Sequence, residues 1–390
     1  MATAPVIRSD APGSFPWSVF HERHPELVRQ VLDALPYGPA QRAAVERLLV
    51  ESTTGVLEPP DGSVQDREQW LAWGEGLWGR PWGEAPFLWA ENWFYHRLID
   101  ATGWFRPGAW RGIDPFGPFK AAELAGPAVD DELAALEPLG ELPRRQREAA
   151  LLASALWGNR ADLSFGMTAT GDTTASDPVV DDSALFWTEL ERAPGGRVCV
   201  VADNAGRELL PDLVLIDHLL GEGLAAEVVL YVKPRPYFVS DATTADLLAT
   251  VERLRAARSP RAAAVGRRLW RALGTGELAV RTHAFFCAPL TFHELPADLR
   301  AEFAGAALTV FKGDLNYRRL VGDRLWPPTT PFADVVAYFP SSVAALRTLK
   351  SDVVVGLAPA VLARLDATGA RWRTSGRHAV VQVHRRPPGR

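Results

Sequence analysis

The sequence predicts an α/β fold: a doubly wound, largely parallel sheet in a three-layer arrangement, with a helical N-terminal region. Two observations indicate this. Residues 15–165 carry apolar side chains mainly at helical spacing, whereas from about residue 184 short β-rich runs alternate with helical stretches. Strands that alternate with helices are typical of parallel sheets covered on both faces. We therefore expect a helical N-terminal region over 15–165 and an α/β domain over 184–385.

Helical patterns come first along the chain. Leu27, Val28, Val31, Leu32 and Leu35 recur at helical spacing before a proline. A second strong pattern spans residues 86–101, and its proline suits the first turn of a helix. Further helical patterns cover residues 43–50, 67–78, 133–136 and 146–156.

The α/β region contains seven β-rich runs. They lie at residues 197–201, 227–232, 278–286, 307–311, 334–338, 353–355 and 379–383. Helical candidates between them cover residues 208–220, 244–257 and 298–304. Pro211 is compatible with the first of these helices if it falls within the first turn, where its missing N–H has no helical partner.

Composition excludes several classes of protein. The net charge of −5 gives no electrostatic basis for binding nucleic acid. The longest apolar runs are shorter than a membrane span, and residues 1–14 lack the apolar segment of a signal peptide. The two cysteines, Cys199 and Cys287, lie in apolar segments, so we expect buried thiols. We expect a cytoplasmic protein with a small-molecule partner, and the oligomeric state is left open.

Polar side chains follow the β-rich run at 197–201, where Asp203 and Asn204 precede a helical pattern. In open α/β sheets, ligands bind at the carboxyl ends of the strands. A carboxylate and an amide oxygen at that edge suit a hard divalent cation. The alternative is that Asp203 or Asn204 caps the following helix.

A second group of polar residues lies in the proline-constrained loop after the run at 227–232. Asp241 ends this loop, just before the helical pattern at 244–257. It either caps that helix or supplies a third oxygen ligand to the same metal. The presence of Asp203 and Asn204 at an equivalent position favours the ligand.

A third group concentrates charge directly after the run at 307–311. Cations beside backbone amides and a glycine are what a phosphate requires. The alternative is an ordinary solvated loop, and Lys350, further along, is by itself most often a surface lysine. The residues of this group are Lys312, Gly313, Asp314, Leu315, Asn316, Tyr317 and Arg318.

These motifs together resemble the metal-dependent damage-control phosphatase family, long known as a domain of unknown function, and within it the acidic-residue methyltransferase-like branch. The resemblance covers roughly residues 15–383. It rests on several long motifs in the right order. They are residues 91–97, 114–116, 156–164, 203–209, 233–241, 311–318 and 346–350. One departure is Ala205, where relatives often carry serine.

The resemblance implies a role for each matched position. Asp203, Asn204 and Asp241 match metal ligands, usually for Mn²⁺, Co²⁺ or Ni²⁺, so 184–385 is expected to be the metal-binding catalytic domain. The segment 313–317 and Lys350 match positions that contact the substrate and its phosphate. Glu208 matches an acidic position linked to S-adenosylmethionine. Possible pocket residues contributed by the helical region are Glu91, Asn92 and Arg97.

The resemblance predicts a metal-dependent phosphatase acting on small phosphorylated metabolites such as sugar phosphates, for example fructose 1-phosphate. The nucleophile is left open: a water activated by the metal, or Asp203 or Asp241 attacking directly to form an aspartyl-phosphate. One alternative is an S-adenosylmethionine-dependent carboxyl (glutamate) O-methyltransferase, although no convincing glycine-rich Gly-x-Gly-x-x-Gly loop follows a strand. Another is a metabolite-binding or regulatory protein that keeps the fold.

Overall fold

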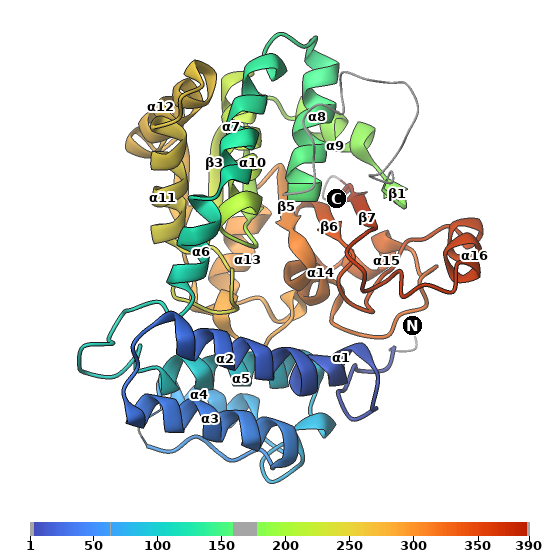
Figure 1. Cartoon of the computed structure of the whole chain (residues 1–390). Coiled ribbons are helices and arrows are strands. Elements are labelled where there is room, and N and C mark those ends of the chain that lie inside the picture. The colour runs from blue at the N-terminus through green and yellow to red at the C-terminus, as the bar shows by residue number, and fades with distance from the viewer. Residues whose placement is uncertain (1–3, 63, 159–177, 388–390) are drawn as a thin grey trace.

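The structure is a computed structural model that describes residues 4–62, 64–158 and 178–387. Its described residues form a seven-stranded, mostly parallel sheet in the order β1-β7-β6-β5-β2-β3-β4, with helices on both faces. A separate layer of N-terminal helices lies beyond one end of the strands (Figure 1). The predicted α/β, doubly wound fold class is confirmed.

The strands are β1 Val180–Asp181, β2 Gly196–Val201, β3 Ala225–Tyr231, β4 Leu278–Arg281, β5 Leu308–Lys312, β6 Ser342–Thr348 and β7 Ala379–His384. The helices before the sheet are α1 Phe15–Ser18, α2 His24–Ala34, α3 Pro39–Thr54, α4 Arg67–Trp73, α5 Phe87–Ala101, α6 Gly117–Leu124, α7 Pro127–Leu139 and α8 Arg144–Trp157, with a π-helix at Val19–Arg23 and a 3₁₀ turn at Trp82–Glu84. Those within the α/β part are α9 Ser183–Arg192, α10 Gly206–Gly221, α11 Thr244–Arg255, α12 Pro260–Thr275, α13 Ala297–Ala304, α14 Gly313–Val321, α15 Phe332–Val336 and α16 Pro359–Ala367, with 3₁₀ turns at Ala284–Cys287 and Phe292–Glu294.

The centre of the sheet is strand β2, which pairs in parallel with β3 on one side and β5 on the other. After β2 the chain forms β3 and β4 on one side, then crosses over to form β5 and β6 on the other. Strand β7 runs antiparallel to β6. The direction of winding therefore reverses between β2 and β5. A crevice at the carboxyl ends of strands on either side of such a switch point is the usual ligand site of this fold.

The two faces of the sheet belong to different parts of the core. Cys199 and Val201 face one side, in a cluster with residues of α13 and α15. Val198 and Val200 face the other side, in a cluster with α7 to α12. This alternation is what a strand buried on both faces requires, because successive side chains point in opposite directions.

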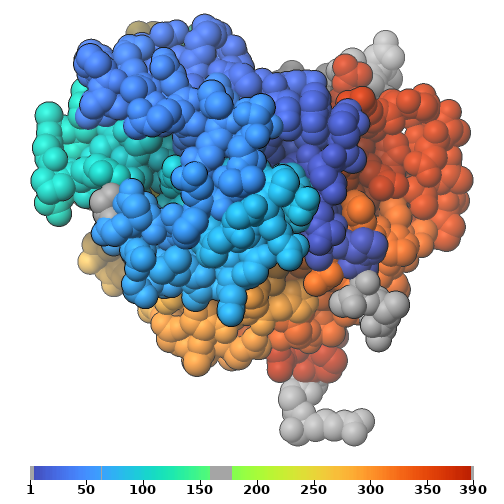
Figure 2. All heavy atoms as spheres, turned by 90° about the horizontal axis from the view of Figure 1, so that it is seen from below, coloured from blue at the N-terminus to red at the C-terminus, as the bar shows by residue number. Residues whose placement is uncertain are grey.

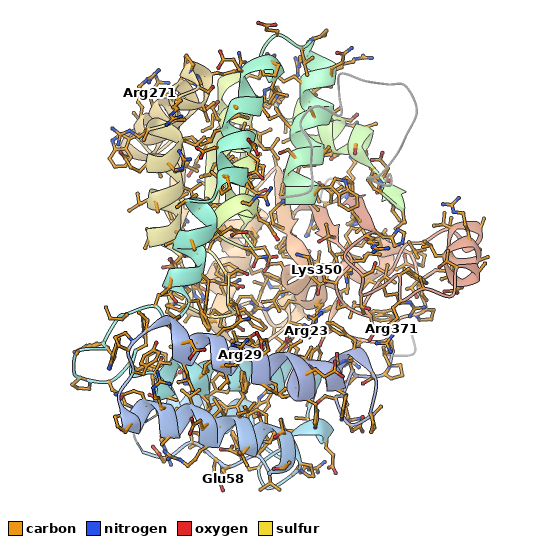
Figure 3. The ribbon with its side chains drawn as sticks, viewed as in Figure 1. Arg23, Arg29, Glu58, Arg271, Lys350 and Arg371 are labelled. Carbon is orange, nitrogen blue, oxygen red and sulfur yellow. The ribbon has the colours of Figure 1, made fainter. Side chains whose placement is uncertain are left out.

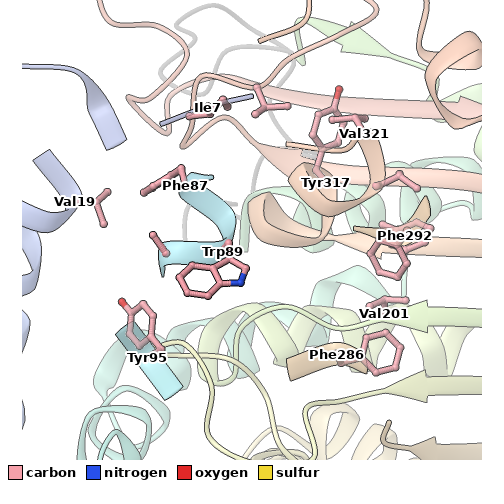
Figure 4. Packing of buried hydrophobic residues seen from close by; sticks show 14 of the residues in the cluster. Ile7, Val19, Phe87, Trp89, Tyr95, Val201, Phe286, Phe292, Tyr317 and Val321 are labelled. Atoms are coloured by element: carbon pink, nitrogen blue, oxygen red, sulfur yellow. The ribbon is translucent and has the colours of Figure 1, made fainter. Parts of the chain in front are cut away.

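The N-terminal helices cover the carboxyl ends of the strands. Phe87 and Tyr95 of α5 belong to the same buried cluster as Tyr317 and Val321 of α14 and Val201 of β2 (Figure 4). Seen from below, helices α1 to α5 occupy the face toward the viewer (Figure 2). Burial of each such large side chain stabilises the fold by about 1.5–3 kcal/mol. This packing holds the helical layer over the predicted ligand edge.

Helices α6, α7 and α8 lie against the α/β part of the molecule, since α6 packs on α10 and α11, α7 on α12, and α8 on α10. The division at 15–165 and 184–385 stays a prediction. Within the part of the chain that the structure describes, no helix combines the length and apolarity needed to cross a membrane.

Several predicted elements were wrong. The run at 278–286 is a strand only to Arg281 and then forms a 3₁₀ turn, the run at 334–338 overlaps helix α15, and residues 353–355 form no strand. Strand β6 was not predicted. Two prolines also differ from expectation: Pro86 is the N-cap residue of α5, and Pro211 is the sixth residue of α10, beyond its first turn.

Candidate metal and phosphate site

Asp203 and Asn204 follow β2 at the switch point, and neither caps the next helix. The N-cap of α10 is Ala205, which makes no side-chain capping bond. The Asp203 side chain is 7% exposed. Asn204 donates from Nδ2 to Asp203 Oδ2 at 3.2 Å and accepts from Ser240 Oγ at 2.7 Å. The Asn204 side chain therefore bonds Asp203 and Ser240 instead of capping the helix.

The loop between β3 and α11 brings Asp241 to the same place. Ala205 N donates to Ser240 O at 2.7 Å, and Ala242 N donates to Asp203 O at 2.8 Å. Asp241 forms a bridge with Asn204. The N-cap of α11 is Thr243, so the alternative in which Asp241 caps that helix is wrong. Asp241 is 2% exposed, and its carboxylate lies beside the Lys233 ammonium.

The buried carboxylates place excess negative charge in the crevice. Burial, followed by the charges of Glu208 and Asp241, raises the pKa of Asp203 well above its usual range, although Lys350 and Lys233 oppose the rise. Burial also raises the pKa of Asp241, against the opposing charge of Lys233. A cation bound between Asp203 and Asp241 would offset this cost.

Whether these residues suit a divalent metal can be judged from their donor atoms. Within the described residues, no three His, Cys, Asp or Glu side chains form a metal-ligating group. Asp203 and Asp241 supply two carboxylates, however, and Asp241 Oδ2 has no hydrogen-bond partner in the described part of the chain. Rotation of the Asn204 amide would turn its oxygen toward Asp203, because Ser240 can accept as well as donate. The three oxygen donors therefore fit a hard divalent ion.

The third predicted motif is a helix and not a loop, because Gly313 to Val321 form α14. Gly313 has φ +77°, and a Cβ atom there would lie 1.7 Å from Asp203 Oδ2. The N-terminus of α14 thus touches the Asp203 carboxylate. An α-helix N-terminus presents unpaired N–H groups that bind anions such as phosphate.

The inner residues of this motif serve the fold around the site. Asn316 is fully buried and donates to Ala202 O and Lys312 O, both at 2.9 Å, which ties α14 to the end of β2. Tyr317 donates to Gln382 Oε1 at 2.8 Å. Leu315 packs in a small apolar cluster with Tyr237. Residues 315–317 therefore hold α14 in place.

The two cations at the ends of this motif, Lys312 and Arg318, form ion pairs with protein carboxylates. Lys312 Nζ lies 2.8 Å from Asp212 Oδ1 and donates to Ala155 O. Arg318 pairs with Glu91 at 2.8 Å and with Asp323 at 2.7 Å. Both cations are at most 5% exposed. They are available to a phosphate only if these ion pairs break.

Lys350 is the exposed cation of the site. Its side chain is 47% exposed, and its Nζ lies 3.3 Å from Glu208 Oε1. Burial lowers the pKa of Lys350, but Glu208 and Asp203 outweigh it and raise the pKa overall. Figure 3 shows Lys350 at the end of the sheet that faces the N-terminal helices.

A cavity of about 150 Å³ lies beside Lys350. It is lined by Glu208, Gly313 and Lys350 together with Leu156, Trp157, Lys312, Leu346, Thr348 and Gly376.

The residues predicted from the helical region have different surroundings. Glu91 is the buried partner of Arg318, and Asn92 donates to Leu88 O at 2.6 Å. The Asn92 Oδ1 atom has no hydrogen-bond partner among the described residues. Arg97 pairs with Glu51 at 3.0 Å and lines a separate groove of about 1130 Å³ between α3 and the segment after α5. The motif at 156–164 lies outside the described residues after Gly158.

Three charged residues near the site were not among the predicted site residues. Lys233 lies 3.3 Å from Asp241 Oδ2, and Arg347 pairs with Asp314 at 2.7 Å. Glu123 of α6 accepts a hydrogen bond from the backbone of Arg207 in the first turn of α10. The position of Lys233 directly after a buried strand is a sequence signal that could have identified it as a site residue. No local signal indicates Glu123.

Comparison with known proteins finds relatives over most of the chain. The model of the damage-control phosphatase ARMT1-like domain matches residues 19–365. Damage-control phosphatase ARMT1 of Danio rerio is 30% identical over 95% of this chain and 94% of its own length. That of Mus musculus is 30% identical over 98% of this chain and 99% of its own. A crystal structure of a DUF89 family protein from Pyrococcus horikoshii has a TM-score of 0.48 and 16% identity, covering 90% of this chain and 94% of that one.

The chain belongs to the ARMT1-like damage-control phosphatase family. A phosphatase role on small molecules is supported by this membership. The methyltransferase alternative is not supported by the family or by the names of these relatives.

Proposed function

We propose that this protein is a metal-dependent phosphatase whose reaction takes place where β2 and β5 end. Asp203, Asn204 and Asp241 would hold a divalent ion such as Mn²⁺, Co²⁺ or Ni²⁺. The observation that carries the proposal is the contact between the buried Asp203 carboxylate and Gly313 at the start of α14. It brings the metal-binding oxygens and a phosphate-binding helix N-terminus to one point.

A bound divalent ion supplies positive charge that polarises a phosphoryl group and lowers the pKa of water. The N-terminus of α14 and the Lys350 ammonium would bind the phosphoryl oxygens and stabilise their charge in the transition state. A protein carboxylate lies at the start of each helix, Glu123 at α10 and Asp203 at α14. We favour the start of α14 for phosphate binding because Gly313 lines the cavity beside Lys350, whereas Gly206 does not.

The cavity beside Lys350 supports a small, hydroxyl-bearing substrate. Glu208 and Thr348 line it with hydrogen-bonding groups, and Trp157 lines it with an aromatic surface. Sugar phosphates such as fructose 1-phosphate have hydroxyl groups that such side chains can bind. The expectations of a cytoplasmic location and of no nucleic-acid partner stay predictions from the sequence.

The test is release of inorganic phosphate from fructose 1-phosphate and a panel of other sugar phosphates in the presence of Mn²⁺. Asp203→Asn keeps the shape of the side chain but removes its charge. Because removal of even an outer-shell partner of a metal typically costs 10–100-fold, we expect a loss of at least about 100-fold. Arg268→Met, which removes an exposed ion pair to Asp217 on α10, is the control. Equal rates for wild type and Asp203→Asn would refute the site.

A further inference from the structure

Lys233 is a buried lysine that faces the predicted metal ligands. It follows β3, and its backbone N donates to Ala242 O at 2.8 Å, at the base of the loop that carries Asp241. Its side chain is 2% exposed, and its Nζ lies 3.3 Å from Asp241 Oδ2. The Tyr237 ring centroid is 5.6 Å from the same nitrogen. The ammonium is therefore confined between an aromatic ring and one carboxylate.

The contact between Lys233 and Asp241 is an ion pair without hydrogen-bond geometry. Neither Lys233 Nζ nor Asp241 Oδ2 has a hydrogen-bond partner among the described residues. A buried ammonium in such surroundings carries a large desolvation cost, and apolar replacements of buried ion pairs are often neutral or stabilising. Stability of the fold alone is thus a weak reason for a lysine at this position.

Two lysines from different segments contact Asp241. Lys233 faces its carboxylate, and Lys120 of α6 donates to its backbone carbonyl at 3.2 Å. Lys120 is itself paired with Asp114 and Asp246, both at 2.8 Å. Lys120 therefore has its own carboxylate partners, whereas Asp241 is the one carboxylate within ion-pair distance of Lys233 in the described chain. Lys233 is the cation best placed to orient the Asp241 side chain.

We propose that Lys233 is a positioning residue that fixes the Asp241 carboxylate in the orientation needed to bind the divalent ion. This inference rests on the metal site of the proposed function. Asp203 and Asp241 are both buried and repel each other, so an unanchored Asp241 would turn away from Asp203. Lys233, which follows β3, holds the Asp241 carboxylate at one of its oxygens.

The experiment is calorimetric titration of the metal-stripped full chain with Mn²⁺ in the absence of substrate. Outer-shell partners of metal sites typically contribute 10–100-fold to affinity. We expect Lys233→Met to raise the Mn²⁺ dissociation constant by about that factor, and Lys233→Arg to restore most of the affinity. Arg197→Met is the matched control, because Arg197 pairs with Glu227 at 2.7 Å across the opposite end of β2 and β3.

A purely structural role of Lys233 would lower the melting temperature of the metal-free protein without changing the Mn²⁺ dissociation constant of the folded protein. An unchanged constant in Lys233→Met would therefore overturn the inference and leave the metal site intact. Absence of Mn²⁺ binding by the wild type would instead overturn the proposed metal site. If the methionine variant does not fold, Lys233→Gln carries the same test.

Discussion

The contact between Gly313 and Asp203 gives the sharpest test of the site, because α14 contains its own control. Gly313 starts the helix at φ +77°, and Gly322 follows its end at φ +88°. Alanine at either position adopts a left-handed conformation that costs about 1–2 kcal/mol. At Gly322 the nearest atom to a Cβ lies 3.5 Å away, an ordinary contact. Gly322→Ala therefore adds backbone strain and nothing else.

At Gly313 the added Cβ would lie 1.7 Å from Asp203 Oδ2, where ordinary contact begins at 3.4 Å. The Asp203 carboxylate must then move by more than about 1 Å, a displacement that can reduce catalysis by roughly 100-fold. Gly313→Ala should lose more stability than Gly322→Ala by urea denaturation, because displacement of the buried Asp203 side chain adds about 1–3 kcal/mol, so the two rates are compared where both variants are folded. We expect kcat/KM for phosphate release to fall about 100-fold in Gly313→Ala and less than about twofold in Gly322→Ala. Equal activity of the two variants would show that the contact has no catalytic role.

Two further predictions concern single charges. Lys350→Met should lower kcat/KM for phosphate release by about 10–100-fold, because a cation facing the phosphate is lost. Unchanged kinetics would return Lys350 to an ordinary surface role. Burial, with a smaller contribution from Arg23, lowers the pKa of His24 to about 3, so the unfolded chain binds more protons than the folded chain below pH 6.5. Stability should then fall as the pH drops from 6.5 toward 3, by up to about 5 kcal/mol from this residue. His24→Phe, which keeps an aromatic ring beside Phe94, should flatten that part of the pH profile in denaturation experiments, and an unaltered profile would contradict the assignment.

The parts of the fold that follow local rules were predictable from the sequence. β2 and β5 are continuous apolar runs buried on both faces, and the pattern located both within one or two residues. β6 was missed because its apolar stretch is short, is centred on the weak strand formers Ala344 and Ala345, and ends on the charged Arg347. Arg347 is fully buried and pairs with Asp314, a contact between residues 33 positions apart in the chain. No local pattern reveals such a partner.

The candidate site was predictable to a similar extent. The carboxyl ends of parallel strands meet at one edge, so Asp203 and Gly313 could be placed together before the structure was known. The partners of the cations could not, since Lys312 pairs with Asp212 and Arg318 with Glu91 through tertiary contacts. The sequence shows the charge of each side chain but not which charges are already neutralised.

We propose that a divalent metal at the ends of β2 and β5 drives phosphoester hydrolysis. The most direct measurement is the initial rate of phosphate release from fructose 1-phosphate by EDTA-treated, metal-stripped protein, before and after addition of Mn²⁺, Co²⁺ or Ni²⁺. We expect negligible release without metal and restoration by these ions, with no restoration in Asp203→Asn. Release that is insensitive to EDTA, or no release with any of the three ions across the sugar-phosphate panel, would contradict it.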